Sequence, residues 1–256
     1  MISLVICSRT SQLNESLRQN IVKTIGAKYE IILIDNSKNK LSIFEAYNKG
    51  VELSKYSFIC FMHDDIHYLT DNWGKLALSR FENNQVGAIG ISGSPYLSLF
   101  PGPWWSSGLI SKYIVEVDNN KERLVNISYK RAENNAVEVV TLDGVWLFVR
   151  KSVFNTIKFD NSTFKGYHFY DLDLSLQLKQ SGFILLSVYD ILIKHQSMGN
   201  INYSWIKNGF LFSFKWRSIL PISQYPVSVK QLAHFEFKSI KFCLKTLYRL
   251  LKKDFN

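Results

Sequence analysis

Apolar runs and amphipathic segments alternate along the first half of the chain. Short continuous apolar runs predict buried strands at residues 2–7, 31–35, 58–62 and 86–91. Apolar side chains at helical spacing predict helices at residues 42–54 and 71–83. Strands and helices that alternate in this way are typical of βαβ units, and continuous apolar strands are typical of a sheet covered on both faces. The pattern therefore predicts an α/β fold with a mainly parallel central sheet.

The second half of the chain is less regular. Residues 93–108 are rich in Gly, Pro and Ser and predict a long loop, and the polar residues 116–136 predict a surface excursion. Further elements are expected as a strand pair at 137–142 and 145–149, a short helix at Lys151, a helix at 170–180, and strands at 183–188 and 191–194. After Gly199 the pattern is aromatic and helical. We therefore expect one domain over residues 1–200, with halves 1–92 and 93–200, and a helical, basic extension over 201–256.

Composition and cysteine use narrow the class of protein. A hydrophobic share of 46% in 256 residues is enough for one large α/β domain. Cys7, Cys60 and Cys243 are odd in number and widely spaced, which favours free thiols in a reducing compartment. The chain shows no signal-peptide pattern and no run of about 20 apolar residues, so a cytoplasmic location is expected.

The excess of positive charge is concentrated at one end of the chain. A formal net charge of +10 suggests nucleic acid, an anionic membrane or a small anionic substrate as the partner. Residues 226–256 hold seven Lys and Arg against Glu236 and Asp254, about half of the excess. The remainder is only mildly basic, so we expect no nucleic-acid partner.

Polar residues follow three of the predicted strands. They are Cys7-Ser8-Arg9, Asp35-Asn36-Ser37 and His63-Asp64-Asp65. In an open α/β sheet, ligands bind beyond the carboxyl ends of the strands. Any one of these groups could merely cap a strand or start a helix, but the three together predict a nucleotide site.

Two of these residues, Asp64 and Asp65, are adjacent carboxylates at one strand end. They would repel each other unless a hard cation lies between them and a substrate oxygen. A diphosphate leaving group needs such a cation, since negative charge grows on it as the bond breaks. The alternative is a helix N-cap, but six residues separate the pair from the helix at Asp71.

These residues carry a resemblance to a known family. Asp35, the helix with Asn48, and His63-Asp64-Asp65 resemble the nucleotide half of a GT-A glycosyltransferase of family 2, in the branch with His-x-Asp in place of Asp-x-Asp. The resemblance implies a GT-A-type Rossmann-like sandwich. It also implies that Asp65 is a metal ligand, that His63 and Asp64 lie near the ribose or phosphate, and that Asp35 and Asn48 line the nucleotide pocket. Cys7, Ser8, Arg9 and Asn36 are expected in the same pocket.

The helix at 170–180 resembles the family's Glu-Asp-x-Asp-Leu segment, with Tyr170 in place of Glu. The resemblance implies that Asp171 is the general base. On a helix Asp171 and Asp173 point about 200° apart, so only one of them can face the site, and Asp173 is expected to orient its neighbours or cap the helix. The structural alternative is an acidic helix N-terminus that complements the helix dipole. His168 and Tyr170 are expected near the acceptor.

Further site residues follow from the same resemblance. His195 follows a predicted strand where the family has a metal ligand for Mn²⁺ or Mg²⁺, although a lone His is also common in structural roles. Asp143 and Gly144 fall at a turn that contacts the donor sugar or acceptor. Trp104 and Trp105 either stack on a sugar or pack in the core. The resemblance covers about residues 1–200.

The implied function is inverting transfer of a sugar from a nucleoside diphosphate sugar to an acceptor hydroxyl. A UDP-sugar is favoured as donor and a glycan or lipid-linked molecule as acceptor, in bacterial-type surface glycan synthesis. The main alternative is a non-catalytic nucleotide- or glycan-binding relative, which His63 in the metal motif supports. A sugar-phosphate nucleotidyltransferase is less favoured because residues 7–11 lack a glycine for a phosphate loop.

The last segment, residues 227–255, interleaves leucine and phenylalanine with lysine and arginine. This pattern predicts a basic amphipathic helix. Such a helix lies on an anionic membrane surface, packs on another subunit as in a homodimer, or docks on its own domain. The lipid-linked acceptors of the resembled family favour a peripheral membrane location.

Overall fold

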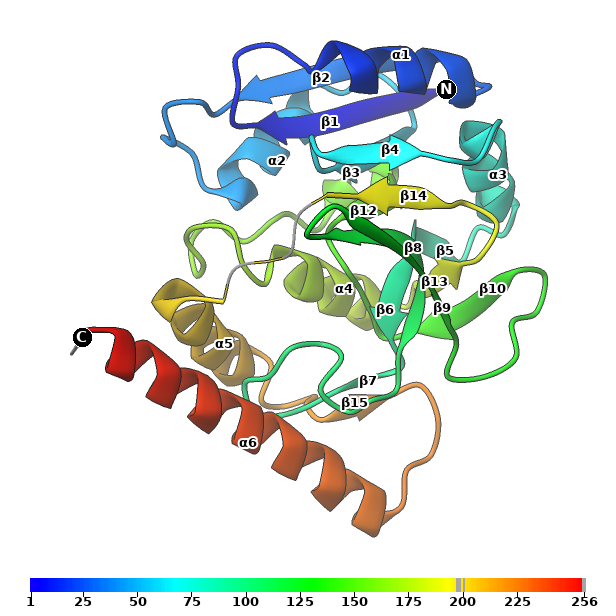
Figure 1. The fold of residues 1–256 in the computed structure, drawn as a ribbon. Coiled ribbons are helices and arrows are strands. Elements are labelled where there is room, and N and C mark those ends of the chain that lie inside the picture. Colours follow the sequence, from blue (N-terminus) through cyan, green and yellow to red (C-terminus); the bar gives the residue numbers. More distant parts are fainter. Residues whose placement is uncertain (197–198, 200, 255–256) are drawn as a thin grey trace.

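The strongest apolar runs form a central sheet of seven strands in the computed structural model, which describes residues 1–196, 199 and 201–254 (Figure 1). In spatial order the strands are β10 (Ala136–Val139), β13 (Ile184–Val188), β5 (Val86–Gly90), β12 (Trp146–Arg150), β3 (Phe58–Met62), β1 (Ile2–Ser8) and β2 (Tyr29–Asp35). Pairing is parallel for β1 with β2, β1 with β3, and β13 with β5. Because β12 is antiparallel to both β3 and β5, these two also run in one direction. Only β12 and the edge strand β10 oppose the rest, so the predicted mainly parallel sheet is confirmed.

Both faces of this sheet are covered, which explains the continuous apolar strands. Leu4 and Ile6 of β1 point into one core with Trp73, while Val5 between them points into the other core with Phe44. Neighbouring residues on a strand face opposite sides, so each side chain needs its own apolar surroundings.

Four helices lie along this sheet. They are α1 (Glu15–Thr24), α2 (Ile43–Leu53), α3 (Trp73–Ser79), which continues as a short 3₁₀ turn (Arg80–Glu82), and α4 (Tyr170–Gln180). The sequence predicts the last three, and α2 begins at a capping box in which Ser42 and Glu45 satisfy each other's backbone N–H groups. Helix α1 is not predicted by the pattern. Its buried face contains Asn20, which exchanges hydrogen bonds with the Tyr68 backbone, so apolar spacing alone does not reveal it.

A second sheet lies beyond the carboxyl end of β3 and the amino end of the antiparallel β12. Its order is β11 (Thr141–Leu142), β6 (Ser92–Ser94), β8 (Ser111–Asp118), β14 (Ile193–His195) and β4 (Ile66–Tyr68), with β9 (Lys121–Ile127) on the other side of β8. Strands β14 and β4 are antiparallel, with His195 opposite Ile66. This pairing brings the residues before β4 close to the end of β14.

Two predicted features of the second half need correction. The loop expected over 93–108 contains part of β6 and all of β7 (Tyr96–Leu97). The surface excursion expected over 116–136 is mostly exposed and contains most of a hairpin of β8 and β9. The strand pair expected over 137–149 is not a pair. Instead β10 joins β13, β11 joins β6, and β12 inserts between β3 and β5. These partners are distant in sequence, and local periodicity does not specify them.

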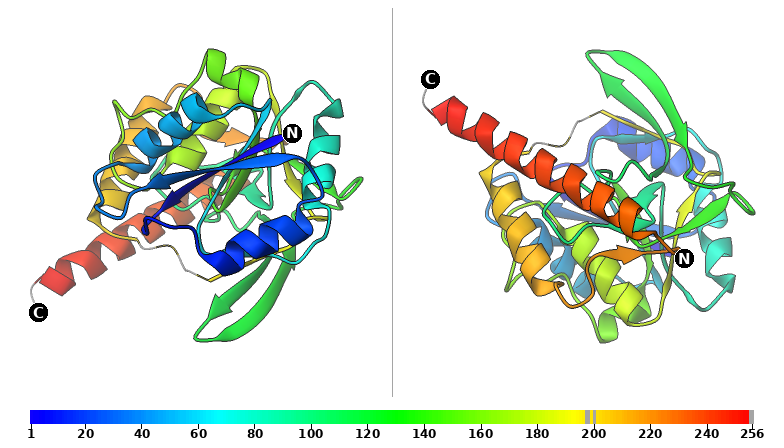
Figure 2. Two further views of the ribbon diagram at one scale, coloured as in Figure 1. Left: turned by 90° about the horizontal axis from the view of Figure 1, so that it is seen from above. Right: turned by 90° about the horizontal axis from the view of Figure 1, so that it is seen from below.

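The C-terminal segment is helical as predicted. Helix α5 (Tyr203–Lys215) is followed by β15 (Ile222–Ser223), which pairs with β7, and by the long helix α6 (Val229–Asp254). Helices α5 and α6 lie side by side below the sheets (Figures 1 and 2), where Trp205 contacts Phe242. The predicted helix end at Phe255 lies outside the described residues. Within the described part of the chain, no helix is long and apolar enough to cross a membrane.

Candidate functional site

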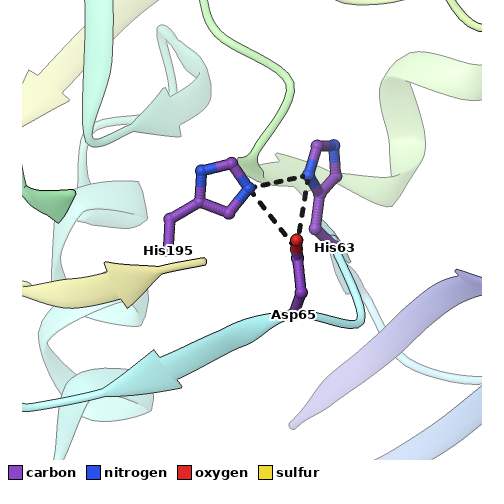
Figure 3. Close-up of side chains that lie close together, drawn as sticks. All are labelled: His63, Asp65 and His195. Carbon is purple, nitrogen blue, oxygen red and sulfur yellow. Dashed lines mark hydrogen bonds and ion pairs between the residues drawn. The ribbon is translucent and has the colours of Figure 1, made fainter. Parts of the chain in front are cut away.

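His63, Asp65 and His195 form a cluster where the two sheets meet (Figure 3). His63 and Asp65 lie in the turn between β3 and β4, and His195 ends β14. His195 Nε2 lies 3.4 Å from Asp65 Oδ1 and 3.3 Å from His63 Nδ1, and His63 Nδ1 lies 3.8 Å from the same Asp65 oxygen. One ligand atom from each residue therefore lies within 4.8 Å of the others. The β14–β4 pairing explains how residues so distant in sequence meet.

The hydrogen bonds of Tyr170 favour one tautomer of His63. The single hydroxyl hydrogen of Tyr170 is donated to the Gly144 carbonyl at 3.0 Å. His63 Nε2 lies 3.3 Å from the same hydroxyl oxygen, so this nitrogen must be the donor in their hydrogen bond. Burial, and then the nearby His195, lower the pKa of His63, which favours its neutral form. A neutral ring with its proton on Nε2 has its lone pair on Nδ1, the atom that faces the cluster.

This donor set fits a divalent cation. Two imidazole nitrogens and a carboxylate oxygen converge, and such a mixed nitrogen and oxygen set suits divalent transition-metal ions. The resemblance implied that His63 lies near the ribose or phosphate, and the structure brings it into contact with both predicted metal ligands. The signal for this was its position two residues before Asp65, where the usual motif has an acidic ligand.

Asp171 lies at the start of α4, close to the same cluster. Its Oδ2 accepts a hydrogen bond of 2.9 Å from the backbone N–H of Gly144, and its Oδ1 accepts one from the N–H of Leu172. Burial, and then the neighbouring carboxylate of Asp143, raise the pKa of Asp171 to about 7. Trp104 donates its indole N–H to Asp143 at 2.8 Å and so holds that second carboxylate in place. An acid with a pKa near neutrality can accept and release a proton at ordinary pH.

Gly144 is required by the close approach of Tyr170. A Cβ atom at position 144 would lie 2.0 Å from the Tyr170 hydroxyl oxygen. Only a residue without a side chain lets the backbone carbonyl accept from Tyr170 while its N–H donates to Asp171. The turn that carries Asp143 and Gly144 thus joins the histidine cluster to Asp171.

Asp173 points away from this site, as the helical spacing predicts. Its carboxylate is buried and accepts hydrogen bonds from Trp216 Nε1 at 2.8 Å and Gln177 Nε2 at 2.8 Å. The ammonium of Lys215 lies 2.7 Å away. Burial raises the pKa of Asp173, and these partners oppose that effect. Asp173 therefore ties α4 to the end of α5.

A cavity of about 300 Å³ opens beside Asp65 at the end of β1. Ser8 donates a 2.8 Å hydrogen bond to Asp64, and Arg9 adds its backbone N–H and a guanidinium 3.8 Å away. The cavity is lined by Ser8, Arg9, Thr10, Asn14, Asp64, Asp65 and Gln196. Sequence reasoning did not single out Thr10, Asn14 or Gln196. Thr10 and Gln196 directly follow predicted site residues, whereas Asn14 carries only the signal of a helix N-cap.

Three other predicted nucleotide-site residues have structural contacts. The amide of Asn48 is bonded to the backbone of Phe159 through both its nitrogen and its oxygen, and Asn36 holds the Leu41 backbone in the same way. Burial raises the pKa of the Cys7 thiol to about 11. None of these three lines the cavity beside Asp65. Asp35 keeps an exposed carboxylate that accepts from the Ser37 N–H.

Of the predicted acceptor residues, some are buried and others are at least partly exposed. Trp104 is buried against Asp143, whereas Trp105 has an exposed fraction of 45% and contacts Trp104 edge-on. Tyr170 is buried beside the cluster, and His168 is half-buried two residues before it. Trp105 is therefore the tryptophan with a face available to a ligand.

Comparison with known families gives one match that covers most of the chain. A family model described as "Glycosyltransferase like family" matches residues 3–207. Among curated proteins, no sequence matches this chain.

Solved structures give the fold. GalNAc-T7 with UDP, GalNAc and Mn²⁺ superposes with a TM-score of 0.54 and 13% identity, over 77% of this chain and 44% of that protein. This chain thus spans less than half of GalNAc-T7. The mannosyltransferase PcManGT from Pyrobaculum calidifontis, with GDP-Man and Mn²⁺, has a TM-score of 0.56 and 8% identity, over 97% of this chain and 74% of that one. S. aureus TarS 1-349 has a TM-score of 0.52 and 11% identity, over 93% and 70% of the two chains.

Proposed function

This chain belongs to the glycosyltransferase-like family, and on that basis we propose that it is an inverting glycosyltransferase with the GT-A fold. It moves a sugar from a nucleoside diphosphate sugar to an acceptor hydroxyl. The observation that carries the proposal is the connection, through Tyr170 and Gly144, between the His63–Asp65–His195 cluster and the carboxylate of Asp171. A displacement at a sugar carbon needs a site for the leaving diphosphate and a base for the acceptor, side by side.

The cluster is proposed to hold Mn²⁺ or Mg²⁺ through His63 Nδ1, Asp65 Oδ1 and His195 Nε2. The converging nitrogen and oxygen atoms support it, and both GalNAc-T7 and PcManGT were crystallised with Mn²⁺. A bound divalent cation neutralises charge that develops on a departing diphosphate. Asp64 is held by Ser8 and Arg9 at the cavity wall, beside Asp65.

Asp171 is proposed as the general base. Its carboxylate takes the proton of the acceptor hydroxyl as the acceptor oxygen attacks the anomeric carbon from the face opposite the diphosphate, which inverts the configuration. The Gly144 N–H holds one carboxylate oxygen in a fixed direction. A pKa of about 7 makes Asp171 a stronger base than an ordinary aspartate, while much of it is still ionised at neutral pH.

The donor is proposed to be a UDP-sugar bound in the cavity beside Asp65. The cavity volume of about 300 Å³ and the cation of Arg9 support a diphosphate there, with Asp35 toward the base or ribose. GalNAc-T7 was crystallised with UDP, and PcManGT was crystallised with GDP-Man.

The acceptor is proposed to be a glycan or a lipid-linked molecule in surface glycan synthesis. Trp105 supports this choice, because its exposed indole can stack on a sugar ring. Residues 1–92 are assigned to the nucleotide and 93–200 to the acceptor and the base, with residues 201–256 as an extension. A non-catalytic relative that binds a nucleotide or glycan is the alternative, and a nucleotidyltransferase is disfavoured by the family match.

Donor hydrolysis distinguishes the enzyme from a binding relative. The chain is incubated with UDP-, GDP- and dTDP-sugars, with and without Mn²⁺, and release of the nucleoside diphosphate is measured. We expect metal-dependent release from one donor class. Release should fall at least about a hundredfold in Asp171→Asn, since the same carboxylate also activates water. Asp118→Asn, at an exposed position of the β8–β9 hairpin, is the matched control. Metal-dependent binding without any hydrolysis would instead support the binding relative.

A further inference from the structure

Helix α6 docks on its own domain by one face only. Phe235, Ser239, Cys243 and Thr246 are buried along that face. Ser239 is hydrogen-bonded to Ser106 at 2.7 Å, within the loop between β7 and β8. The partly buried Phe242 and Leu250 also pack against the core, but the inner face accounts for only part of the apolar content of α6.

A second apolar face of α6 is exposed. Phe237, Leu244, Tyr248 and Leu251 have exposed fractions of 61%, 62%, 67% and 46%. Their spacings of seven, four and three residues place them along one line of a helix. We call these four residues the outer stripe. Single exposed apolar residues are common on proteins, but a continuous stripe on a long helix marks an interaction surface.

Basic residues border the outer stripe. Within residues 229–252 of α6, Lys230, Lys241, Lys245 and Lys252 are exposed, and the structure pairs none of these four with an acid in the part of the chain that it describes. Lys238 instead donates to the Ser107 carbonyl, and Arg249 donates to Thr246 on the inner face. Glu236, the acid in this range, faces inward, where it accepts from the Tyr96 hydroxyl at 2.6 Å and from the Leu99 N–H at 3.1 Å. The outer face is therefore apolar and cationic, with no acidic side chain among these residues.

We propose that the outer stripe and its lysines bind the surface of an anionic lipid bilayer. Apolar side chains that enter the interface beside cations that meet lipid headgroups are the two features of an interfacial helix. A second copy of this chain fits less well. Pairing two copies through residues 229–252 would bring their lysines together, and Glu236, the acid in this range, faces inward and does not offset them.

The position of α6 links such a bilayer to the proposed acceptor side of the site. Through Glu236 and Ser239, α6 holds the loop that also carries Trp104 and Trp105. Trp104 in turn donates to Asp143 beside Asp171. A helix lying on a membrane would thus keep the acceptor side of the site near lipid-borne substrates, a consequence that rests on the proposed function, whereas the binding itself does not.

Vesicle binding tests the proposal directly with the full chain. Protein is sedimented with phosphatidylcholine vesicles that contain phosphatidylglycerol, and in parallel with pure phosphatidylcholine vesicles. We expect binding to the anionic vesicles at low salt, release at high salt, and little binding to the neutral ones. Failure to bind anionic vesicles at low salt would overturn the proposal.

Substitutions on the outer face sharpen the test without disturbing the inner face. The double change Phe237→Ser with Leu244→Ser should weaken partitioning at least about tenfold. Each of Lys241→Gln and Lys245→Gln should weaken it about fivefold. Leu124→Ser and Lys121→Gln, on the exposed strand β9, are the matched controls and should leave it unchanged. Circular dichroism and the melting temperature verify that each variant is folded.

Two further measurements separate the other outcomes. If light scattering shows a dimer that Phe237→Ser with Leu244→Ser converts to a monomer, while vesicle binding is unchanged, the occupant of the outer stripe is a second copy and the proposal is wrong. Binding of nucleoside diphosphate and Mn²⁺ is measured separately without vesicles. If the chain binds vesicles but no nucleotide, the proposed function is contradicted. The proposal that the outer stripe binds a membrane would still hold.

Discussion

At the scale of single residues, the position of one hydrogen decides what His63 can do. Tyr170 has one hydroxyl hydrogen, and the Gly144 carbonyl, which can only accept, receives it. His63 must then donate from Nε2, which turns the lone pair of Nδ1 toward Asp65 and His195. We therefore propose that Tyr170 positions His63 as a metal ligand, a role distinct from the acceptor contact that the sequence resemblance implied.

Replacing Tyr170 by Phe removes this hydrogen bond and should weaken metal binding. Partners of metal-binding histidines are typically worth about 10–100-fold in affinity. We expect a loss in that range for Mn²⁺ in Tyr170→Phe, measured by calorimetry or paramagnetic resonance. The nitrogen-15 chemical shifts of the His63 ring should change from values typical of a single tautomer to values typical of a mixture of the two tautomers. The exposed Tyr248→Phe is the control. An unchanged tautomer in Tyr170→Phe would show that Tyr170 does not orient His63.

The raised pKa of Asp171 predicts the pH dependence of the reaction. A general base must be ionised, so kcat/KM should fall about tenfold per pH unit below the pKa of about 7 and level off above it. The measurement is a pH profile of donor hydrolysis at saturating Mn²⁺. Asp171→Asn should have a low and flat residual rate. A profile that keeps its rise near pH 7 in Asp171→Asn would assign the titration to another group.

At the scale of elements, α4 directs two carboxylates to opposite sides. Its first turn sends Asp171 to the Gly144 N–H at the sheet edge and Asp173 to Lys215 and Trp216 at the end of α5. The helical rotation between the two positions imposes this division. One helix thus contributes to the site and to the packing of α5.

Asp173→Asn should therefore reduce stability and spare ligand binding. The change weakens a buried ion pair, although Lys215 keeps its 2.8 Å contact with Asp160. We expect a loss of about 1–3 kcal/mol in the free energy of unfolding, read from denaturant titration. Affinity for nucleoside diphosphate and Mn²⁺ should remain close to that of the unaltered chain. A stable Asp173→Asn protein with lost turnover would exchange the roles of the two aspartates.

At the scale of the whole molecule, the site depends on both sheets. His63 and Asp65 follow β3 of the central sheet, and His195 ends β14 of the second one. A ligand that binds this junction connects parts of the fold that are distant in sequence, and its binding energy adds to the stability of the folded chain.

A nucleoside diphosphate with Mn²⁺ should stabilise the fold more than either alone. At a free ligand concentration of 100 times its dissociation constant, the gain is about 2.7 kcal/mol. The proposed cation explains the requirement, because the carboxylates of Asp64 and Asp65 would otherwise repel the diphosphate. The melting temperature is measured with UDP, Mn²⁺ or both. In Asp65→Ala the joint effect should be absent. Equal stabilisation by UDP with and without Mn²⁺ would exclude the metal-dependent mechanism.

The sequence by itself determined the strand and helix alternation, the order of the polar residues at the strand ends and the basic amphipathic end of the chain. These properties are local, since they follow from side-chain periodicity over a few residues. Only the tertiary structure decided which distant residues meet. The β14–β4 pairing joined His195 to His63 across 132 positions of sequence, and Gly144 admitted the Tyr170 hydroxyl. The tertiary structure also divided α6 into a docked face and an exposed face. Burial of a side chain depends on which parts of the fold pack against it, and not on its neighbours in the sequence.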